Sequence, residues 1–564
     1  MSTYAAESRR FPAFALLFAS LIPARPASAQ RWTLPEPVQA RVDSVFAFVG
    51  RDAPGCALGV VQQGRITYGR GYGLANLDWR IPITTTTVFD IGSTSKQFTA
   101  TAVALLAGDG VLSLDDDVRR WIPEMPEYGT TITLRHLLNH TSGVRDYLTL
   151  LSLAGFEFAN VFDEEDGVRL IARQRALNFD PGAEFLYSNS GYLLLAAVVR
   201  RASGQSLRRF LEARVFDPLG MAHTSIWDDN TEILAARATG YAPSEGGGWE
   251  IDHAWNFQMG GDGQVITSVE DLARWDANFY QPTVGGQALL DRLHTRGILN
   301  DGDTIPYALG LTLDAYRGLR RVQHGGAWAG FRAMLMRFPD QHTSIVIECN
   351  RGDANTTAYA NAVVDAVLAD AFPEAAGTPA GPAAVRPAAA AGPAVAASAE
   401  RVARWVGAYR LAERPEYLFF EAREGDLWLA SGAGVRLEAL SDTTFRVPSG
   451  GTLFVFASSP GGMHVTARGA RWDRVASAPL PYLSELVGSY ASPELDAVFE
   501  IVSDADRLTL RRPNAEPVTL RPGRTDEWVA LGSTLTFTRD AGRVTGFRVW
   551  AGRVTGIVFE RTGG

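Results

Sequence analysis

A stretch of mostly alanine, proline and glycine, residues 375–399, divides this 564-residue chain into two parts of different character. It reads AAGTPAGPAAVRPAAAAGPAVAASA and shows no apolar periodicity. This composition predicts a linker that is semi-rigid where proline is frequent. A chain of this length also exceeds what one hydrophobic core supports. We therefore expect separately folded units on the two sides of the linker.

The part before the linker, residues 30–374, alternates between helical and strand patterns. The segment 56–73 predicts two strands joined by a turn at Gln63 and Gly64. Three more strands are expected near the other end of this part, at 320–330, 331–340 and 343–350. Helices are expected at 94–107, 162–174, 191–203, 205–216, 268–279 and 357–371. The pattern predicts an α/β (α+β) domain whose sheet takes strands from both ends, with a helical middle.

The part after the linker contains a tandem repeat. WVGAY at 405–409 recurs as LVGSY at 486–490, and DLWL at 426–429 recurs at the same offset as RLTL. Each unit of roughly eighty residues has room for about eight short strands, and closure into a barrel removes exposed strand edges. We expect two small antiparallel β-barrels, 400–479 and 480–564, with a pair of open sandwiches as the alternative.

The N-terminus has the pattern of an export signal. Arg9 and Arg10 precede an apolar run, and ASAQ offers a cleavage site after Ala29. We expect a signal peptide over 1–29 and a periplasmic or secreted mature chain without a membrane span. The sequence leaves Sec and Tat export both open. The only two cysteines, Cys56 and Cys349, exclude a disulfide framework but can pair in an exported protein.

The charge balance excludes one class of partner. The formal net charge is −9 and the pI is about 5.5, with no basic stripe to neutralise phosphates. Nucleic acid binding is therefore not expected, and the expected partner is a small-molecule substrate. The oligomeric state stays open.

Lys96 is the only lysine in the chain. Compositional accident is one explanation. The other is a need for an amine, because a guanidinium keeps its proton whereas a desolvated amine can accept one. Ser93 lies three residues earlier, where an extended segment meets a predicted helix, so the two side chains share a face. The pair fits a serine nucleophile activated by a lysine base, although Ser93 can also be a plain helix cap.

Two further stretches contain polar groups suited to the same chemistry. In FLYSNSGYLLL, the Tyr187 phenol can relay a proton, and the Asn189 amide can bind a substrate carbonyl or Lys96; alternatively Tyr187 packs and Asn189 caps the next helix. In VQHGGAWAG, two glycines within a strand indicate close approach of another backbone. His324 would then face the cleft, and the N–H groups of Ala327 and Ser93 would form an oxyanion hole. The alternative is a bulge with a surface histidine.

In the order Ser-x-x-Lys, Tyr-x-Asn, His-Gly-Gly, these elements resemble the serine β-lactamase and penicillin-binding protein superfamily. The similarity is greatest to its class C β-lactamase, D-alanyl-D-alanine carboxypeptidase and D-aminopeptidase branch, and it covers roughly residues 33–371. Four other segments look like phrases of that family: ITLRHLLNHTSGV (132–144), FDPLGMAHTSI (216–226), GDGQVITSVEDLARW (261–275) and YALGL (307–311).

The resemblance implies a β-lactamase-like catalytic domain, with an antiparallel sheet flanked by helices and an all-helical lobe. It implies that Ser93 is the nucleophile, that Lys96 and Tyr187 are the proton-transfer pair, and that Asn189 positions substrate. His324, followed by Gly325 and Gly326, takes the first position of the family's Lys-Thr-Gly motif. No cofactor and no metal are expected, since His136 and His140 have a metal-pair spacing but no nearby third ligand. In the resembled fold Cys56 and Cys349 are neighbours, either bonded or as a buried pair.

The third motif departs from the best-known members. A histidine is mostly neutral at pH 7 and would hold a substrate carboxylate less firmly than lysine. His-x-Gly versions look like the D-aminopeptidases and esterases, as does a linker followed by two β units. The expected function is an exported serine hydrolase that forms an acyl-enzyme with a small peptide, amide or ester, most like a D-aminopeptidase or D,D-peptidase. Alternatives are an esterase or β-lactamase, or, from another class, a slowly deacylating β-lactam sensor or a partner-binding protein. At least one β unit is expected to lean over the cleft.

Overall fold

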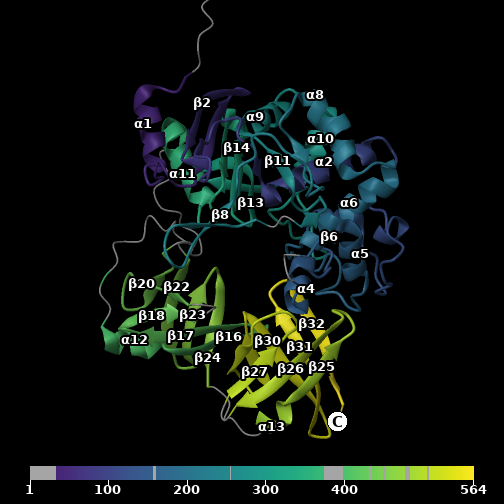
Figure 1. Cartoon of the computed structure of the whole chain (residues 1–564), viewed down its shortest axis with the longest axis vertical. Coiled ribbons are helices and arrows are strands. Elements are labelled where there is room, and N and C mark those ends of the chain that lie inside the picture. The colour runs from purple at the N-terminus through teal and green to yellow at the C-terminus, as the bar shows by residue number, and fades with distance from the viewer. Residues whose placement is uncertain are drawn as a thin grey trace, which may run out of the picture.

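The computed structural model describes residues 33–563 except 157–159, 254–255, 374–394, 396–397, 431–433, 449–451, 477–482 and 505–506. The expected signal peptide and nearly all of the expected linker lie outside the described residues. Figure 1 shows the mixed helix and strand part above and two all-β units below it, one green and one yellow. The yellow unit lies beneath the helices α4 and α5.

A six-stranded antiparallel sheet forms the centre of the upper part, in the order β12-β13-β14-β15-β1-β2. Its strands are β1 (Cys56–Gln62), β2 (Arg65–Tyr72), β12 (Thr312–Tyr316), β13 (Leu319–Trp328), β14 (Phe331–Phe338) and β15 (Thr343–Cys349). The sheet thus joins strands from both ends of the segment, as the sequence predicts. Strand β12 was not predicted.

Both faces of this sheet are covered, which explains why β1 reads as an apolar run rather than an alternating one. Leu58 and Val60 pack in one core with helices α1 (Glu36–Val45) and α11 (Thr356–Val367). Ala57 and Val61, which point the other way, pack in a second core with helix α9 (Val269–Asn278). Gly59 lets α9 approach closely, because a Cβ there would lie 2.4 Å from Val269 Cγ1.

The two cysteines form a disulfide across this sheet. Cys56 opens β1, Cys349 ends β15, and the antiparallel register places them opposite each other with their Cα atoms 4.0 Å apart. Both are fully buried. Of the two alternatives that the sequence left open, the structure contains the bonded one.

The helical lobe is built around α2 (Lys96–Gly108) and α6 (Asn189–Ser203), whose residues are nearly all buried. Helix α6 ends at Gly204, which adopts the left-handed conformation that favours glycine (φ 73°). The other helices of this part are α3 (Leu134–Leu138), α4 (Tyr147–Ala154), α5 (Glu164–Ala172), α7 (Leu207–Leu211), α8 (Asp217–Leu219) and α10 (Gly286–Leu293). Short strands complete it: β3 (Leu74–Asn76), β4 (Ile81–Pro82), β5 (Phe89–Asp90), β6 (Phe162–Asp163), β7 (Ser225–Ile226), β8 (Tyr241–Pro243), β9 (Trp249–Ile251), β10 (Phe257–Gln258) and β11 (Val265–Thr267).

The second β unit is a closed barrel of eight antiparallel strands that follows the short helix α13 (Leu483–Leu486). The barrel closes because the first strand pairs with the last as well as with the second. Its strands are β25 (Gly488–Ser492), β26 (Ala497–Asp504), β27 (Arg507–Arg511), β28 (Val518–Pro522), β29 (Glu527–Ala530), β30 (Ser533–Asp540), β31 (Arg543–Ala551) and β32 (Val554–Thr562).

The first β unit is a nearly closed sheet of the same winding, preceded by helix α12 (Ala399–Trp405). The sheet ends at two short strands that are separated only by Leu437, so one bent stretch pairs with a neighbour on each side. The strands are β16 (Gly407–Leu411), β17 (Tyr417–Arg423), β18 (Asp426–Leu429), β19 (Val435–Arg436), β20 (Glu438–Ala439), β21 (Thr444–Arg446), β22 (Leu453–Ser459), β23 (Gly462–Ala467) and β24 (Ala470–Val475). The predicted fold class, a mixed domain followed by two β-barrels, is confirmed.

The second barrel docks on the helical lobe through polar contacts, which include a buried ion pair. Arg145 Nη1 lies 2.6 Å from Glu494 Oε1, and both side chains are almost fully buried. Asn178 donates to the Arg553 carbonyl and accepts from the Thr555 N–H. No helix in the described part of the chain has both the length and the apolar character needed to cross a bilayer.

Candidate active site

Ser93 and Lys96 meet at the start of α2. The 3₁₀ turn Gly92–Ser95 leads directly into the helix, and Lys96 Nζ lies 3.2 Å from Ser93 Oγ. Lys96 is fully buried, and its Nζ also donates to Asn189 Oδ1 at 2.9 Å and to the Asp262 carbonyl at 2.6 Å. Nζ therefore has three hydrogen-bond partners within the site.

The turn exposes Ser93 and buries its neighbours. Among residues 91–100, Ser93 alone is partly exposed. Gly92 sits in the left-handed region (φ 48°), and its N–H donates to Asp90 Oδ1 at 2.7 Å. Ser93 does not cap α2, because Ser95 holds the N-cap position and makes no side-chain cap bond. The plain-cap alternative for Ser93 is therefore wrong, and the nucleophile interpretation stays a prediction.

Tyr187 and Asn189 both contact Lys96. Asn189 begins α6, and its side chain binds Lys96 rather than capping the helix. The Tyr187 ring centroid lies 4.9 Å from Lys96 Nζ. The Tyr187 hydroxyl is buried and has no hydrogen-bond partner among the described residues. The phenol therefore reaches the site as predicted but is not hydrogen-bonded to Ser93.

Strand β13 closes the other side through its two glycines. A Cβ on Gly326 would lie 1.8 Å from the Ile91 carbonyl oxygen, and one on Gly92 would lie 2.7 Å from Ala327 N. The predicted close approach of two backbones therefore occurs here, between β13 and the turn that carries Ser93. It brings the backbone of Ala327 beside that turn, where the predicted oxyanion hole would form.

His324 lines the cleft but is nearly buried, and it is held at both ring nitrogens. Nδ1 lies 2.7 Å from the Gly325 carbonyl, so it carries the proton, and Nε2 accepts from the Tyr307 hydroxyl at 2.9 Å. Burial, reinforced by the nearby Lys96 charge, lowers the pKa of His324 from 6.5 to about 4. His324 is therefore uncharged at neutral pH and brings no positive charge to the third motif.

Sequence reasoning missed several residues that support the site. His140 packs against Tyr187 with ring centroids 4.2 Å apart, and burial holds its pKa well below the usual value. Asp146, the N-cap of α4, accepts from the Asn189 N–H through Oδ2 at 2.7 Å. His140 lies in a family phrase, which was a usable signal, but no local pattern marks Asp146.

The two histidines with metal-pair spacing each bind a backbone N–H group through Nδ1. His136 Nδ1 accepts from the Thr133 N–H as part of a capping box, and His140 Nδ1 accepts from the Ser188 N–H. The described residues contain no group of three or more His, Cys, Asp or Glu side chains that could hold a metal ion.

The site opens onto a cavity of about 750 Å³. It contains every side chain predicted for the site except the buried Lys96, and one residue from outside the catalytic part, Arg553 of the second barrel. Arg553 Cζ lies 4.8 Å from the Tyr187 ring centroid. The contact between Arg553 and Tyr187 is thus consistent with the expectation that a β unit reaches the cleft.

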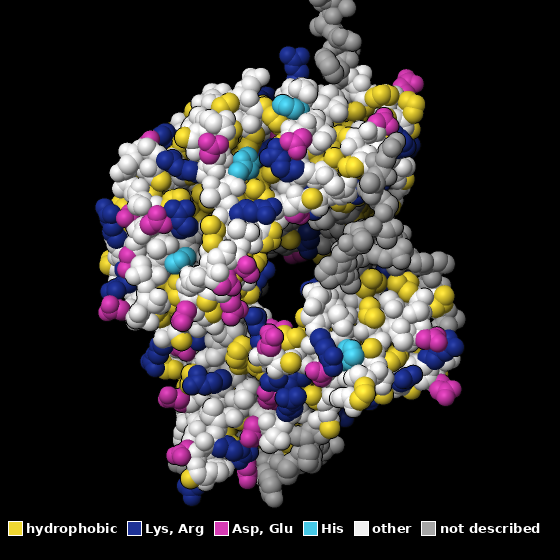
Figure 2. Space-filling view, turned by 180° about the vertical axis from the view of Figure 1, so that it is seen from behind, with side chains coloured by type: hydrophobic (Ala, Val, Ile, Leu, Met, Phe, Trp, Pro, Cys, Tyr) yellow, Lys and Arg dark blue, Asp and Glu magenta, His cyan; other side chains and the backbone are white. Residues whose placement is uncertain are grey.

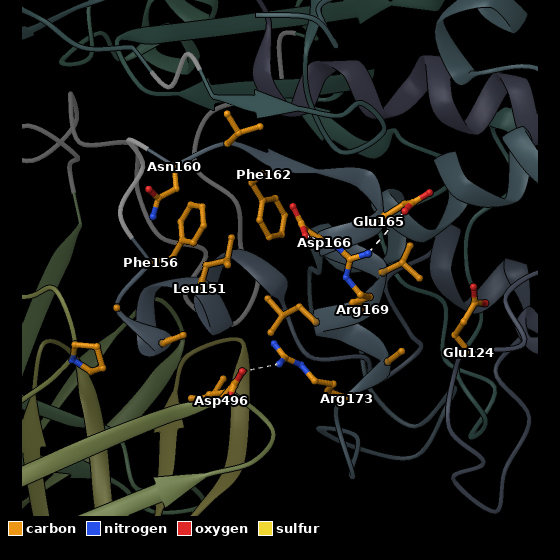
Figure 3. Close-up of a pocket in the computed structure, with 18 of the residues that line it drawn as sticks. Glu124, Leu151, Phe156, Asn160, Phe162, Glu165, Asp166, Arg169, Arg173 and Asp496 are labelled. Atoms are coloured by element: carbon orange, nitrogen blue, oxygen red, sulfur yellow. Dashed lines mark hydrogen bonds and ion pairs between the residues drawn. The ribbon is translucent and has the colours of Figure 1, made fainter.

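A second cavity, of about 910 Å³, lies between α4, α5 and the second barrel (Figure 3). Phe156 and Phe162 form one side of this cavity. Arg169 and Arg173 each form an ion pair with a neighbouring carboxylate. None of the predicted site residues lines it.

Comparison with known proteins gives one matching family model, described as Beta-lactamase, over residues 38–370. Penicillin-binding protein 4* of Bacillus subtilis (strain 168) is 32% identical over 327 residues, which cover 54% of this chain and 69% of that protein. A D-aminopeptidase of Cereibacter sphaeroides is 30% identical over 321 residues, which cover 57% of this chain and 61% of that protein. The chain thus spans about three fifths of the D-aminopeptidase.

Among solved structures, the octameric penicillin-binding protein homologue from Pyrococcus abyssi is similar in fold, with a TM-score of 0.54 at 20% identity. The alignment covers 78% of this chain and 99% of the other.

Proposed function

This chain belongs to the beta-lactamase family, and from that premise we propose that it is a serine hydrolase that forms an acyl-enzyme with a small peptide, amide or ester. One observation carries the proposal. Lys96 Nζ lies 3.2 Å from Ser93 Oγ at the floor of a cavity that also contains Tyr187 and the His324–Ala327 strand. A nucleophile, a proton-transfer group and backbone donors are thus gathered around one space.

In the acylation step, Ser93 Oγ attacks the substrate carbonyl and its proton passes to the Lys96–Tyr187 pair. Negative charge develops on the carbonyl oxygen, where the N–H groups of Ser93 and Ala327 would stabilise it. The pair then gives a proton to the leaving amine or alcohol, with Tyr187 as the donor to the leaving group. A bond to Ser93 Oγ has formed and the scissile bond has broken.

In the deacylation step, water attacks the acyl-Ser93 ester. The same pair takes the proton of the water and returns one to Ser93 Oγ, which restores the starting state. Asn189 holds Lys96 in place through both steps, because its Oδ1 accepts from Nζ.

For the substrate we propose amides or short peptides, because one of the relatives is a D-aminopeptidase. The cavity volume of about 750 Å³ suits a ligand of that size.

For the cellular location we propose export to the periplasm or the medium. The Cys56–Cys349 disulfide supports it, since disulfides persist in oxidising compartments. Fractionation of cells that produce the full chain tests it: we expect the protein outside the cytoplasm and beginning near Gln30. A chain retained in the cytoplasm with Met1 intact would contradict it.

The catalytic proposal is tested by labelling with a fluorophosphonate, which reacts with activated serines. We expect one label per chain, on Ser93, and none on Ser93→Ala. A screen of D-amino-acid amides, p-nitrophenyl esters and nitrocefin then finds the substrate class. Equal labelling of the wild type and Ser93→Ala would refute Ser93 as the nucleophile.

A further inference from the structure

The third motif of this cleft lacks the positive charge that would hold an anionic substrate group. His324 is neutral at pH 7, and its two ring nitrogens are occupied by Gly325 and Tyr307. A carboxylate that enters the cleft therefore meets no free cation at this position.

Two arginines line the cavity. They differ in how much of their positive charge is offset by neighbouring groups. Arg332 Nη1 donates to the carbonyls of Ala329 and Phe331, and the carboxylates of Asp252 and Asp353 act on its charge. Its guanidinium is thus largely offset by its own surroundings.

Arg553 is available. It occupies the turn between β31 and β32 of the second barrel, and its carbonyl accepts from Asn178 Nδ2 at 2.9 Å and from the Asp146 N–H at 3.3 Å. The turn is therefore fixed to the catalytic part by its backbone. Among the described residues, the guanidinium makes no hydrogen bond; it stacks on Tyr187 and lies 4.0 Å from Asp146 Oδ2, with 44% of the side chain exposed.

The contact with Asp146 leaves the guanidinium group of Arg553 free to bind another carboxylate. Asp146 already accepts from the Asn189 N–H and from both the N–H and the hydroxyl of Thr149. The distance of 4.0 Å between Arg553 and Asp146 is too long for a hydrogen bond, so the five N–H donors of the guanidinium remain unused. Two of them can therefore bind a substrate carboxylate in the bidentate geometry that arginine favours. Figure 2 shows an opening between the catalytic part and the barrels, with Lys and Arg side chains along part of its rim.

We propose that Arg553 is a specificity-determining residue supplied by the second barrel, and that it binds a carboxylate on the leaving-group part of the substrate. The side of the substrate follows from Tyr187: the leaving group departs toward the phenol that protonates it, and Arg553 lies against that ring. The inference rests on the proposed hydrolase function. It specifies the substrate class as amides or esters whose leaving group has an acidic end, such as the C-terminal residue of a peptide.

The test compares two esters that differ only in charge, 3-acetoxybenzoate and 3-acetoxybenzamide, on the full-length protein. We expect Arg553→Ala to raise KM for 3-acetoxybenzoate about tenfold or more while kcat stays within threefold, since a lost charge-assisted hydrogen bond has about this effect. KM for 3-acetoxybenzamide should stay within twofold. Arg553→Lys should restore part of the loss. Arg543→Ala, an exposed arginine at the other end of β31, is the matched control and should change neither substrate.

Other outcomes overturn the proposal. An equal loss on both esters would mean that Arg553 only positions Tyr187, and no loss on either would mean that it has no role. Binding without turnover separates this proposal from the hydrolase itself. By calorimetry, Ser93→Ala should bind 3-acetoxybenzoate about tenfold more tightly than Ser93→Ala/Arg553→Ala. Equal affinity would refute the Arg553 site even if the wild type hydrolyses neither ester.

Discussion

At the scale of single residues, Lys96 has the most constrained environment in the site. Its Nζ reaches three acceptors, Ser93 Oγ, Asn189 Oδ1 and the Asp262 carbonyl, and the side chain is fully buried. An arginine would hold its proton permanently and would need room for a planar group that this space lacks.

We therefore expect Lys96→Arg to lower kcat about a thousandfold or more on any accepted neutral ester, since a positioned acid or base contributes about 10²–10⁴. Lys96→Met, which removes the amine with less crowding, should be equally inactive and more stable than Lys96→Arg. Ser93→Ala combined with either should be no worse than Ser93→Ala alone, because groups that act as a unit are not additive. Activity of Lys96→Arg within tenfold of the wild type would rule out Lys96 as a proton-transfer group.

The low pKa of His324 predicts how the stability of the protein depends on pH. Its pKa is about 4 in the folded protein, against an ordinary value of 6.5. The unfolded chain therefore takes up a proton near pH 6.5, whereas the folded protein resists until about pH 4. The contribution to stability is fully present above pH 6.5 and is lost as the pH falls through this window.

Comparison with His324→Gln isolates this contribution, because the other titrating groups are common to both proteins. Between pH 7.5 and 4, the wild type should lose about 3 kcal/mol of unfolding free energy relative to the variant. Urea unfolding at several pH values measures it. A difference that does not change with pH would show that His324 titrates normally.

At the scale of elements, the segment before α4 connects the second barrel to the catalytic groups. Arg145 pairs with Glu494 of the barrel, and the next residue, Asp146, accepts from the N–H of Asn189. Ser190, beside Asn189, donates to the Arg145 carbonyl. Barrel, segment and α6 are thus joined by consecutive hydrogen bonds that end at the residue binding Lys96.

We predict that Glu494→Gln destabilises the protein and lowers kcat together. The change leaves the Arg145 charge buried without its partner, which typically costs about 3–5 kcal/mol. The urea unfolding midpoint and the turnover of a neutral ester measure the two effects.

Asp496→Asn is the matched control. Asp496 pairs with Arg173 at the same interface, but the two side chains are 85% and 44% exposed (Figure 3). An exposed pair contributes little, so this variant should stay within about 1 kcal/mol of the wild type. If Glu494→Gln is equally silent, the barrel does not support the site through this pair.

At the scale of the whole molecule, the Cys56–Cys349 disulfide joins two adjacent strands of the catalytic sheet. These are the first and the last of its strands along the chain, and the two cysteines are 293 residues apart in the sequence. Closing so long a loop restricts the unfolded chain, and native disulfides typically contribute about 2–5 kcal/mol. We expect Cys56→Ala/Cys349→Ala to lower the urea unfolding midpoint accordingly.

A reducing agent added during unfolding should bring the wild type to the midpoint of the double variant and leave the variant unchanged. Two free thiols in the denatured, oxidised wild type would contradict the bond.

Local signals in the sequence determined much of the fold and most of the proposed site. Helical periodicity located α2, α6 and α9, and three-residue spacing at a helix start brought Ser93 and Lys96 together, because such residues always share a face. The glycine pair after His324 marked a close approach of two backbones, since only glycine leaves room for it. The repeat after the linker determined the two β units. All of these depend on neighbours within a few residues or on internal similarity.

Only the tertiary structure decided the remainder. No local pattern in the sequence marks Arg553, Glu494 or Asp146. These residues enter or support the site through contacts between segments that are hundreds of residues apart in the sequence. Two such contacts are Arg145–Glu494 and Asn178–Arg553. The charge of His324 likewise depends on burial and on the nearby charge of Lys96, which is far from it in the sequence. The reason is physical: spacing along the chain sets which side chains share an element, whereas docking of whole elements sets which charges are desolvated, paired or left free to meet a substrate.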